Sequence, residues 1–235
     1  MRRVLTHMDA MQRTQSPMIV LAICLTALAG FVDALVFSSL GGFFAAFMSG
    51  NTTRLGVSLA AGRYDEVRMA GALILSFVSG AMIAAVIARH WPRRAQAMAM
   101  IGVTLLIGLA AALGQHQPDT RTLLLLAGAM GLENGGFARG GEVGVGLARM
   151  TGLLVRMGEG LAGALMGDAD RWGWLRHLLL WLGFLCGVVM GARCHGAFDS
   201  KALWLAAGAA GALAIAIAAL SRAGAQTGPW GPRPA

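Results

Sequence analysis

The sequence predicts an all-α, polytopic membrane protein with about six transmembrane helices, two broken or re-entrant helices and two internal repeats. Three observations support this fold class. Hydrophobic residues make up 57% of the 235 residues and charged residues only 13%, about half the charged share of a soluble domain. Long uncharged runs recur along the chain, and the same order of polar landmarks occurs twice. A lipid bilayer is therefore the expected environment.

Each predicted span is a run of the length that crosses the hydrocarbon core, which needs about 20 apolar residues. The first run is too long for the apolar core of a cleaved signal peptide, about 7–15 residues, so we expect it to be retained. Residues 1–17 form a basic N-terminal segment and residues 222–235 a tail, and both are expected to be cytoplasmic. The six expected spans are residues 18–40, 69–88, 95–114, 122–138, 177–193 and 202–221.

Two Gly-rich stretches between these spans are expected to be broken or re-entrant helices. Residues 43–62 begin apolar and then carry a polar cluster, and residues 143–167 are interrupted by charged side chains. Non-helical backbone at membrane depth is tolerated only where it is buried in protein or lines a water-filled cavity. The alternative interpretation is that both stretches are full but poor spans.

The distribution of basic residues favours the six-span arrangement. The net charge of +8 comes from 18 Arg and a single Lys, and most of them lie between apolar runs, on the flanks that the positive-inside rule assigns to the cytoplasm. If both broken helices crossed the membrane, Arg89, Arg93 and Arg94 would fall on the outer side. Topology thus explains the positive charge, and nucleic-acid binding is not expected.

The two halves of the sequence resemble each other. The first repeat is expected over residues 18–114 and the second over residues 122–221. Polar and small residues recur in the same order in both, with a short insertion before the last pair. The aligned pairs are residues 29–33 with 130–134, residues 48–50 with 150–152, Arg54 with Arg156, and residues 77–80 with 184–187.

The number of spans in each repeat decides how the halves are related. Three spans is an odd number, so the two halves would be inverted relative to one another. Inverted repeats with interrupted helices in matching positions are the arrangement of many secondary transporters, whose binding site lies near the bilayer midplane. Four spans in each half would instead make the repeats parallel.

Two blocks of residues stand out in the sequence. They are Gly30-x-x-Asp33 followed by Phe47-Met48-Ser49-Gly50-Asn51, and Gly131-x-Glu133-Asn134 with Arg139 and Met150-Thr151-Gly152. Both blocks resemble those of a known family, the YoaK-like bacterial membrane proteins. The resemblance covers roughly residues 18–220 and implies a six-span bacterial inner-membrane protein with no established substrate. Gln is usual in that family where Glu133 stands, and residues 143–149 replace a Thr-rich lead-in, so any role of Glu133 belongs to this chain.

Ionisable residues inside the predicted spans are candidates for a binding site. They cost roughly 2.5–3.5 kcal/mol on insertion scales and normally face the interior of a helix bundle. Asp33 lies in the first span, and Glu133 and Asn134 occupy the matching place in the second half. We interpret these residues as a central polar group that binds the solute, tunes charge or carries a proton. The alternative is a hydrogen bond between packed helices or a carboxylate neutralised by an Arg.

The densest polar cluster, residues 49–54, is a second candidate. Asn51 is expected to cap a half-helix over residues 52–61, whose free N–H groups, together with Arg54, would favour an anion. Thr151 and Arg156 mirror this arrangement. The alternative is that the hydroxyls satisfy broken backbone and the Arg side chains pair with acids. The expected substrate-binding residues are Asp33, Ser49, Asn51, Thr52, Arg54, Glu133, Asn134, Thr151 and Arg156.

These features predict a small secondary transporter or permease for a small solute, with an anion as one option. The alternative is a non-transporting membrane scaffold or assembly protein. No sequence motif pairs a nucleophile with a base, so an enzyme is not expected. The five His lie at or beyond span ends and the 14 Met are scattered, so neither a metal nor a cofactor is expected. The expected partners are the bilayer and an unknown solute, and a homo-oligomer is left open.

Overall fold

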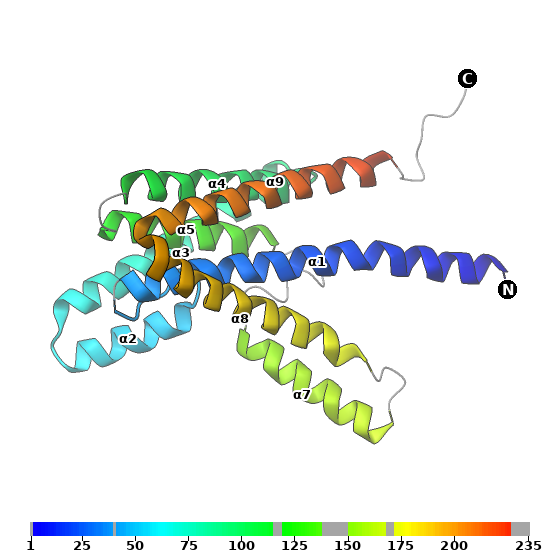
Figure 1. Ribbon diagram of the computed structural model, residues 1–235, viewed down its shortest axis with the longest axis horizontal. Helices are drawn as coiled ribbons and strands as arrows, with labels where there is room; N and C mark the ends of the chain where they lie inside the picture. Colours follow the sequence, from blue (N-terminus) through cyan, green and yellow to red (C-terminus); the bar gives the residue numbers. More distant parts are fainter. Residues whose placement is uncertain (1, 40, 115–118, 138–149, 168–171, 227–235) are drawn as a thin grey trace.

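The computed structural model describes residues 2–39, 41–114, 119–137, 150–167 and 172–226, which form helices joined by turns (Figure 1). The prediction of an all-α protein is confirmed for this part of the chain. The elements are α1 (Arg2–Ser39), α2 (Met48–Ala60), α3 (Tyr64–His90), α4 (Ala95–Leu113), α5 (Thr120–Phe137), α7 (Met150–Met166), α8 (Gly173–Phe198), the short 3-10 helix η1 (Asp199–Lys201) and α9 (Ala202–Gln226).

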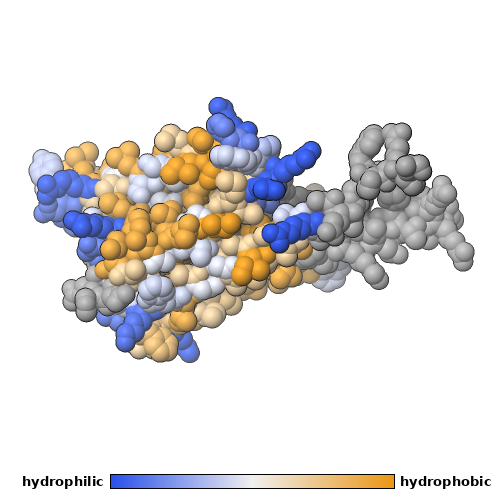
Figure 2. Space-filling view, turned by 90° about the horizontal axis from the view of Figure 1, so that it is seen from above, coloured by the Kyte–Doolittle hydropathy of each residue, from blue (hydrophilic) through white to orange (hydrophobic). Residues whose placement is uncertain are grey.

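The surface of the bundle fits a bilayer. Four stretches of the described residues are long and apolar enough to cross a membrane, namely Met18–Ser39, Tyr64–His90, Ala95–Leu113 and Gly173–Arg222. The last of them contains α8 and most of α9. Figure 2 shows a broad apolar band between hydrophilic residues at the two ends, the pattern that a bilayer and its two interfaces require.

Helix α1 extends well beyond its predicted span. It begins at Arg2 rather than at Met18, and its 38 residues correspond to about 57 Å of helix. The hydrocarbon core is only about 30 Å thick. The basic N-terminal segment therefore continues the first helix past the membrane surface.

Helix α5 is enclosed by its neighbours rather than by lipid. Leu126, Met130 and Phe137 are at most 2% exposed, and α5 packs against α3 and α4. The backbone N–H of Thr122 donates to Asp119 Oδ1 over 2.9 Å at the start of this helix. That bond, and a second one from the Thr122 hydroxyl, lower the pKa of Asp119.

The helices pack in a set of pairs. Helix α1 packs against α8 and α9, α5 against α3 and α4, and α4 against α9. The short helices are peripheral, since α2 packs on α3 and α7 packs on α8. In Figure 1, α1 and α8 run in the same direction, as do α3 and α5, whereas α1 and α5 run in opposite directions.

Glycines set the close approach of α1 and α8. A Cβ atom on Gly30 would overlap the carbonyl oxygen of Phe184, and one on Gly187 would overlap the carbonyl oxygen of Ala27. Only a residue without a Cβ allows the two backbones to come this near, as small residues do between membrane helices.

The contact between α3 and α5 has the same character. A Cβ atom on Gly131 would overlap the carbonyl oxygen of Phe77, and one on Gly80 would overlap the carbonyl oxygen of Gly128. In both pairs, α1 with α8 and α3 with α5, a glycine on each helix thus allows the two backbones to touch.

Candidate functional site

A cavity of about 580 Å³ lies between α1, the residues that precede α2, the start of α7, and α8. Small-molecule sites usually have volumes of roughly 300–1,000 Å³. Phe47 directly precedes α2 and Met150 is the first residue of α7, so both short helices begin at this cavity. Its wall includes Asp33, Phe37, Phe44, Phe47, Met150 and Phe184.

Asp33 positions the segment of residues 41–47, which we call the lead-in segment. Its side chain is only 3% exposed, and its Oδ1 accepts the N–H groups of Ala45 over 2.8 Å and Ala46 over 2.6 Å. Gly41 and Gly42 have φ values of 58° and 98°, which glycine adopts readily. These two residues reverse the chain after α1, and the lead-in segment can therefore return to Asp33.

Asn51 fixes the same segment from the other side. Its Nδ2 donates to the Phe44 carbonyl over 2.7 Å, and its Oδ1 accepts the Phe44 N–H over 3.0 Å. Helix α2 begins at Met48 rather than at Thr52, and no side chain caps it at Phe47. The expectation that Asn51 caps a half-helix is therefore wrong, because its amide is used by the lead-in segment.

Arg54 is engaged by three groups of the protein. Its Nη1 donates to the Gly41 carbonyl over 2.6 Å, its guanidinium carbon lies 4.1 Å from the centre of the Phe43 ring, and its Nε lies 3.4 Å from Glu66 Oε2. The Ser58 hydroxyl also donates to Glu66, over 2.7 Å. Arg54 thus ties α2 to the lead-in segment and to α3.

Four further predicted residues lie apart from the cavity wall. Ser49 and Thr52 are exposed on α2, where the Thr52 hydroxyl donates to the Met48 carbonyl over 2.9 Å. Thr151 and Arg156 are exposed on α7. Among the described residues, the structure does not bring these four side chains to Asp33.

Glu133 and Asn134 are buried next to each other on α5. Glu133 is 0% and Asn134 8% exposed. Neither carboxyl oxygen of Glu133, nor Oδ1 of Asn134, has a hydrogen-bond partner among the described residues, although Asn134 Nδ2 donates to the Met130 carbonyl. Glu133 lies close enough to Asp33 for the two carboxyl groups to interact electrostatically. The structure thus brings together one acid from each half of the sequence.

Residues 21–216 match the family described as proteins of unknown function, DUF1275. The chain belongs to this family. The DUF1275 protein is also 34% identical, over 194 residues, to the UPF0700 transmembrane protein RA0705 of Rhizobium meliloti (strain 1021), and the alignment covers 83% of each chain. No solved structure matches it. The assignment to a family of bacterial multi-pass membrane proteins is thereby confirmed.

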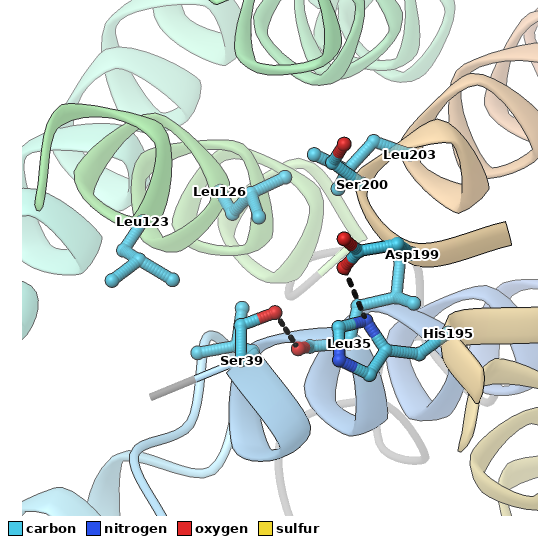
Figure 3. Close-up of a pocket in the computed structure, with 9 residues that line it drawn as sticks. Leu35, Ser39, Leu123, Leu126, His195, Asp199, Ser200 and Leu203 are labelled. Carbon is cyan, nitrogen blue, oxygen red and sulfur yellow. Dashed lines mark hydrogen bonds and ion pairs between the residues drawn. The ribbon is translucent and has the colours of Figure 1, made fainter. Parts of the chain in front are cut away.

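A second pocket of the DUF1275 protein lies where α1, α5, α8 and α9 meet (Figure 3). The Ser39 hydroxyl there donates to the Leu35 carbonyl over 2.7 Å, and His195 Nδ1 lies 3.9 Å from Asp199 Oδ1. Its volume of about 10 Å³ is close to the smallest space that a single water occupies. This pocket is too small for a solute.

The sequence interpretation missed the aromatic residues of the DUF1275 site. The Phe44 ring centre lies 5.3 Å from that of Phe37 and 5.2 Å from that of Phe47, and Phe184 adds a ring from α8. Gly50 leaves room for them, since a Cβ there would lie 2.6 Å from the Phe47 ring. The run Phe-Phe-Ala-Ala-Phe over residues 43–47 could have indicated this aromatic wall. It lies directly before the polar cluster of residues 49–54.

Proposed function

We propose that this DUF1275 protein is a permease that moves a small solute across the membrane by exposing the cavity to each side in turn. The proposal requires two structurally equivalent halves that can rock against each other, with a binding site where they meet. It involves no covalent chemistry. The observation that carries it is the equivalence of the helix contacts in the two halves.

The repeat alignment pairs α1 with α5, α2 with α7, α3 with α8 and α4 with α9. Under this pairing the contact of α1 with α8 corresponds to that of α5 with α3, the contact of α1 with α9 to that of α5 with α4, and the contact of α2 with α3 to that of α7 with α8. The glycine contacts correspond as well. Gly30 on Phe184 matches Gly131 on Phe77, and Gly187 on Ala27 matches Gly80 on Gly128.

Helix directions support an inverted relation between the halves. Helices α1 and α5 run in opposite directions, and α2 and α7 run from the middle of the molecule toward opposite ends (Figure 1). Since α3 returns in the direction opposite to α1, α2 fits a re-entrant helix. We therefore propose six spans, formed by α1, α3, α4, α5, α8 and α9, with both termini in the cytoplasm.

The cavity favours a permease over a scaffold. A protein that only binds an assembly partner needs no recess of ligand size, whereas about 580 Å³ is open beside the buried Asp33. The two short helices both begin at this space, as the interrupted helices of transporters do at their binding sites.

Cysteine labelling tests the re-entrant topology. In a variant without the native cysteines, Gly41→Cys and Arg63→Cys are expected to react with a membrane-impermeant maleimide from the same side, because they flank α2. Arg94→Cys, beyond α3, is expected to react from the opposite side. A Cβ at position 41 meets nothing within 4 Å, but the φ of 58° there costs a non-glycine residue roughly 1–2 kcal/mol, so the yield of Gly41→Cys is compared with that of Arg63→Cys before labelling. Labelling of positions 41 and 63 from opposite sides would contradict the six-span topology.

Solute uptake tests the function itself. Proteoliposomes with the full chain are expected to show saturable uptake of at least one solute from a panel of cations, anions and neutral compounds. Ala192 lines the cavity on α8, and Ala192→Trp is expected to reduce uptake about tenfold or more by filling a site of ordinary ligand size. Ala216→Trp, at an exposed position of α9, is the matched control and should leave uptake unchanged. Absence of saturable uptake for the whole panel would refute the permease.

A further inference from the structure

We propose that the cavity binds a lipophilic organic cation, of the substituted ammonium or phosphonium type. The inference rests on the proposed function in that it names the substrate class of the permease. Binding of the cation itself depends only on the cavity and does not require transport. It departs from the anion that the Arg residues of the sequence suggested.

The acidic groups favour a cation. Asp33 is part of the cavity wall, and Glu133 on α5 lies within electrostatic reach of Asp33. Two acids that share one buried site repel each other when both are charged, and a cation placed beside them removes that repulsion. Both carboxyl oxygens of Glu133 lack a hydrogen-bond partner among the described residues, so none of those residues compensates this acid by hydrogen bonding.

Among the residues that the structure describes, the positive groups near the cavity are weaker than a full charge or are already engaged. Each helix end at the cavity, before Met48 and at Met150, carries roughly half a positive charge. At the first of these ends, Asp33 already accepts the N–H groups of Ala45 and Ala46. When both carboxyl groups are ionised, their two negative charges exceed the two half charges of the helix ends, so the ionised pair favours a cation.

Arg54 does not supply a competing anion site. Its guanidinium donates to the Gly41 carbonyl and lies 3.4 Å from Glu66. Its counterpart in the repeat, Arg156, is exposed on α7. The basic residues on which an anion site would depend are therefore directed to protein groups or to the surface.

The chemistry of the wall selects the kind of cation. A small inorganic cation needs about six oxygen ligands, whereas most of the wall is carbon from Phe37, Phe44, Phe47, Phe184 and Met150. Aromatic faces attract a cation through their quadrupole, and the attraction is largest when the cation is poorly hydrated. An organic cation with an apolar body meets both conditions.

Two probes of the same shape and opposite charge test the inference. Tetraphenylphosphonium and tetraphenylborate would be titrated against the full chain in nanodiscs, with bound probe counted after rapid separation. We expect saturable binding of the phosphonium and only non-saturating, lipid-like partition of the borate. Saturable binding of the borate alone, of both probes equally, or of neither would overturn the inference.

Matched variants locate the binding. Glu133→Gln removes an acid without breaking a hydrogen bond of the described chain, and Asp33→Asn keeps an oxygen that can accept the Ala45 and Ala46 N–H groups. Each is expected to weaken phosphonium binding about tenfold, the effect of roughly 1.4 kcal/mol. Asp65→Asn, at an exposed acid on α3, should leave it unchanged. Equal binding by all three variants and the wild type would overturn the inference.

A second pair of variants tests the aromatic wall. Phe184→Leu is expected to weaken phosphonium binding several-fold, because a cation over an aromatic face gains about 0.5–2 kcal/mol. Phe198→Leu lies on the same helix, is exposed and is outside the wall, so it should have no effect. Unchanged binding by Phe184→Leu would contradict the cation site.

The binding assay separates this inference from the proposed function. Phosphonium binding that depends on Asp33 and Glu133, without saturable uptake of any solute, would support the cation site and refute the permease. Saturable uptake of an anion, together with no phosphonium binding, would support the permease and refute the cation site.

Discussion

Gly131→Leu is expected to leave little folded protein in the membrane. Any Cβ at position 131 overlaps the carbonyl oxygen of Phe77, and a backbone oxygen cannot rotate away as a side chain can. Helices α3 and α5 would have to separate, and their contacts around the buried residues of α5 would be lost. Overpacking of a tight core costs about 1–3 kcal/mol even where side chains can adjust, so a clash with backbone should exceed that range.

Detergent-solubilised yield and the thermal midpoint measure this effect. The matched control is Gly108→Leu on α4, where a Cβ meets nothing within 4 Å, and it should have nearly the wild-type midpoint. Gly30→Leu, at the equivalent contact of α1 with Phe184, should be as damaging as Gly131→Leu. A wild-type midpoint for Gly131→Leu would show that the close helix contact is not needed.

Asp33→Ala is expected to release the lead-in segment and remove one side of the cavity. The substitution leaves the N–H groups of Ala45 and Ala46 without their acceptor. Each unsatisfied buried donor costs about 1–3 kcal/mol, so the segment gains by moving to water or lipid headgroups. Phe44 and Phe47 would move with it, and the cavity would lose two of its aromatic residues.

Hydrogen exchange of the peptide that spans residues 41–50 reports this change. The Ala45 and Ala46 amides should exchange on the order of 30-fold faster in Asp33→Ala, which corresponds to the loss of about 2 kcal/mol. Asp33→Asn keeps an accepting oxygen and should retain most of the protection. Equal exchange in Asp33→Ala and the wild type would contradict the proposed role of Asp33 in the fold.

The fold class could be predicted because it depends on the length and hydrophobicity of single segments, and these do not depend on what each segment contacts. An apolar run of about 20 residues predicts a membrane helix whatever its neighbours are, and α3, α4 and the apolar part of α1 follow directly. The extension of α1 to Arg2 could not be predicted in this way. Many of residues 2–17 are polar, so no apolar run predicts a helix there. The helix of the span simply continues into them.

The site was only partly predictable. Asp33 stands out as a single charge within an apolar run, so the sequence identifies it as important. Its partners are backbone N–H groups, which every non-proline residue carries, so residue types cannot reveal them. The partner of Arg54 was missed for a different reason. Glu66 follows in the next helix, and only the turn between α2 and α3 brings the two side chains together.

The pairing of α1 with α8 and of α3 with α5 means that the two halves are intertwined. A nascent chain that ends after α4 has its glycine faces on α1 and α3 but not the helices that cover them. The face of α3 stays open until α5 has been made, and the face of α1 stays open until translation has reached α8, when most of the polypeptide has been made. We therefore expect the bundle to close in two steps, the second of them late in synthesis, and we expect a fragment of either half to be a target for membrane quality control.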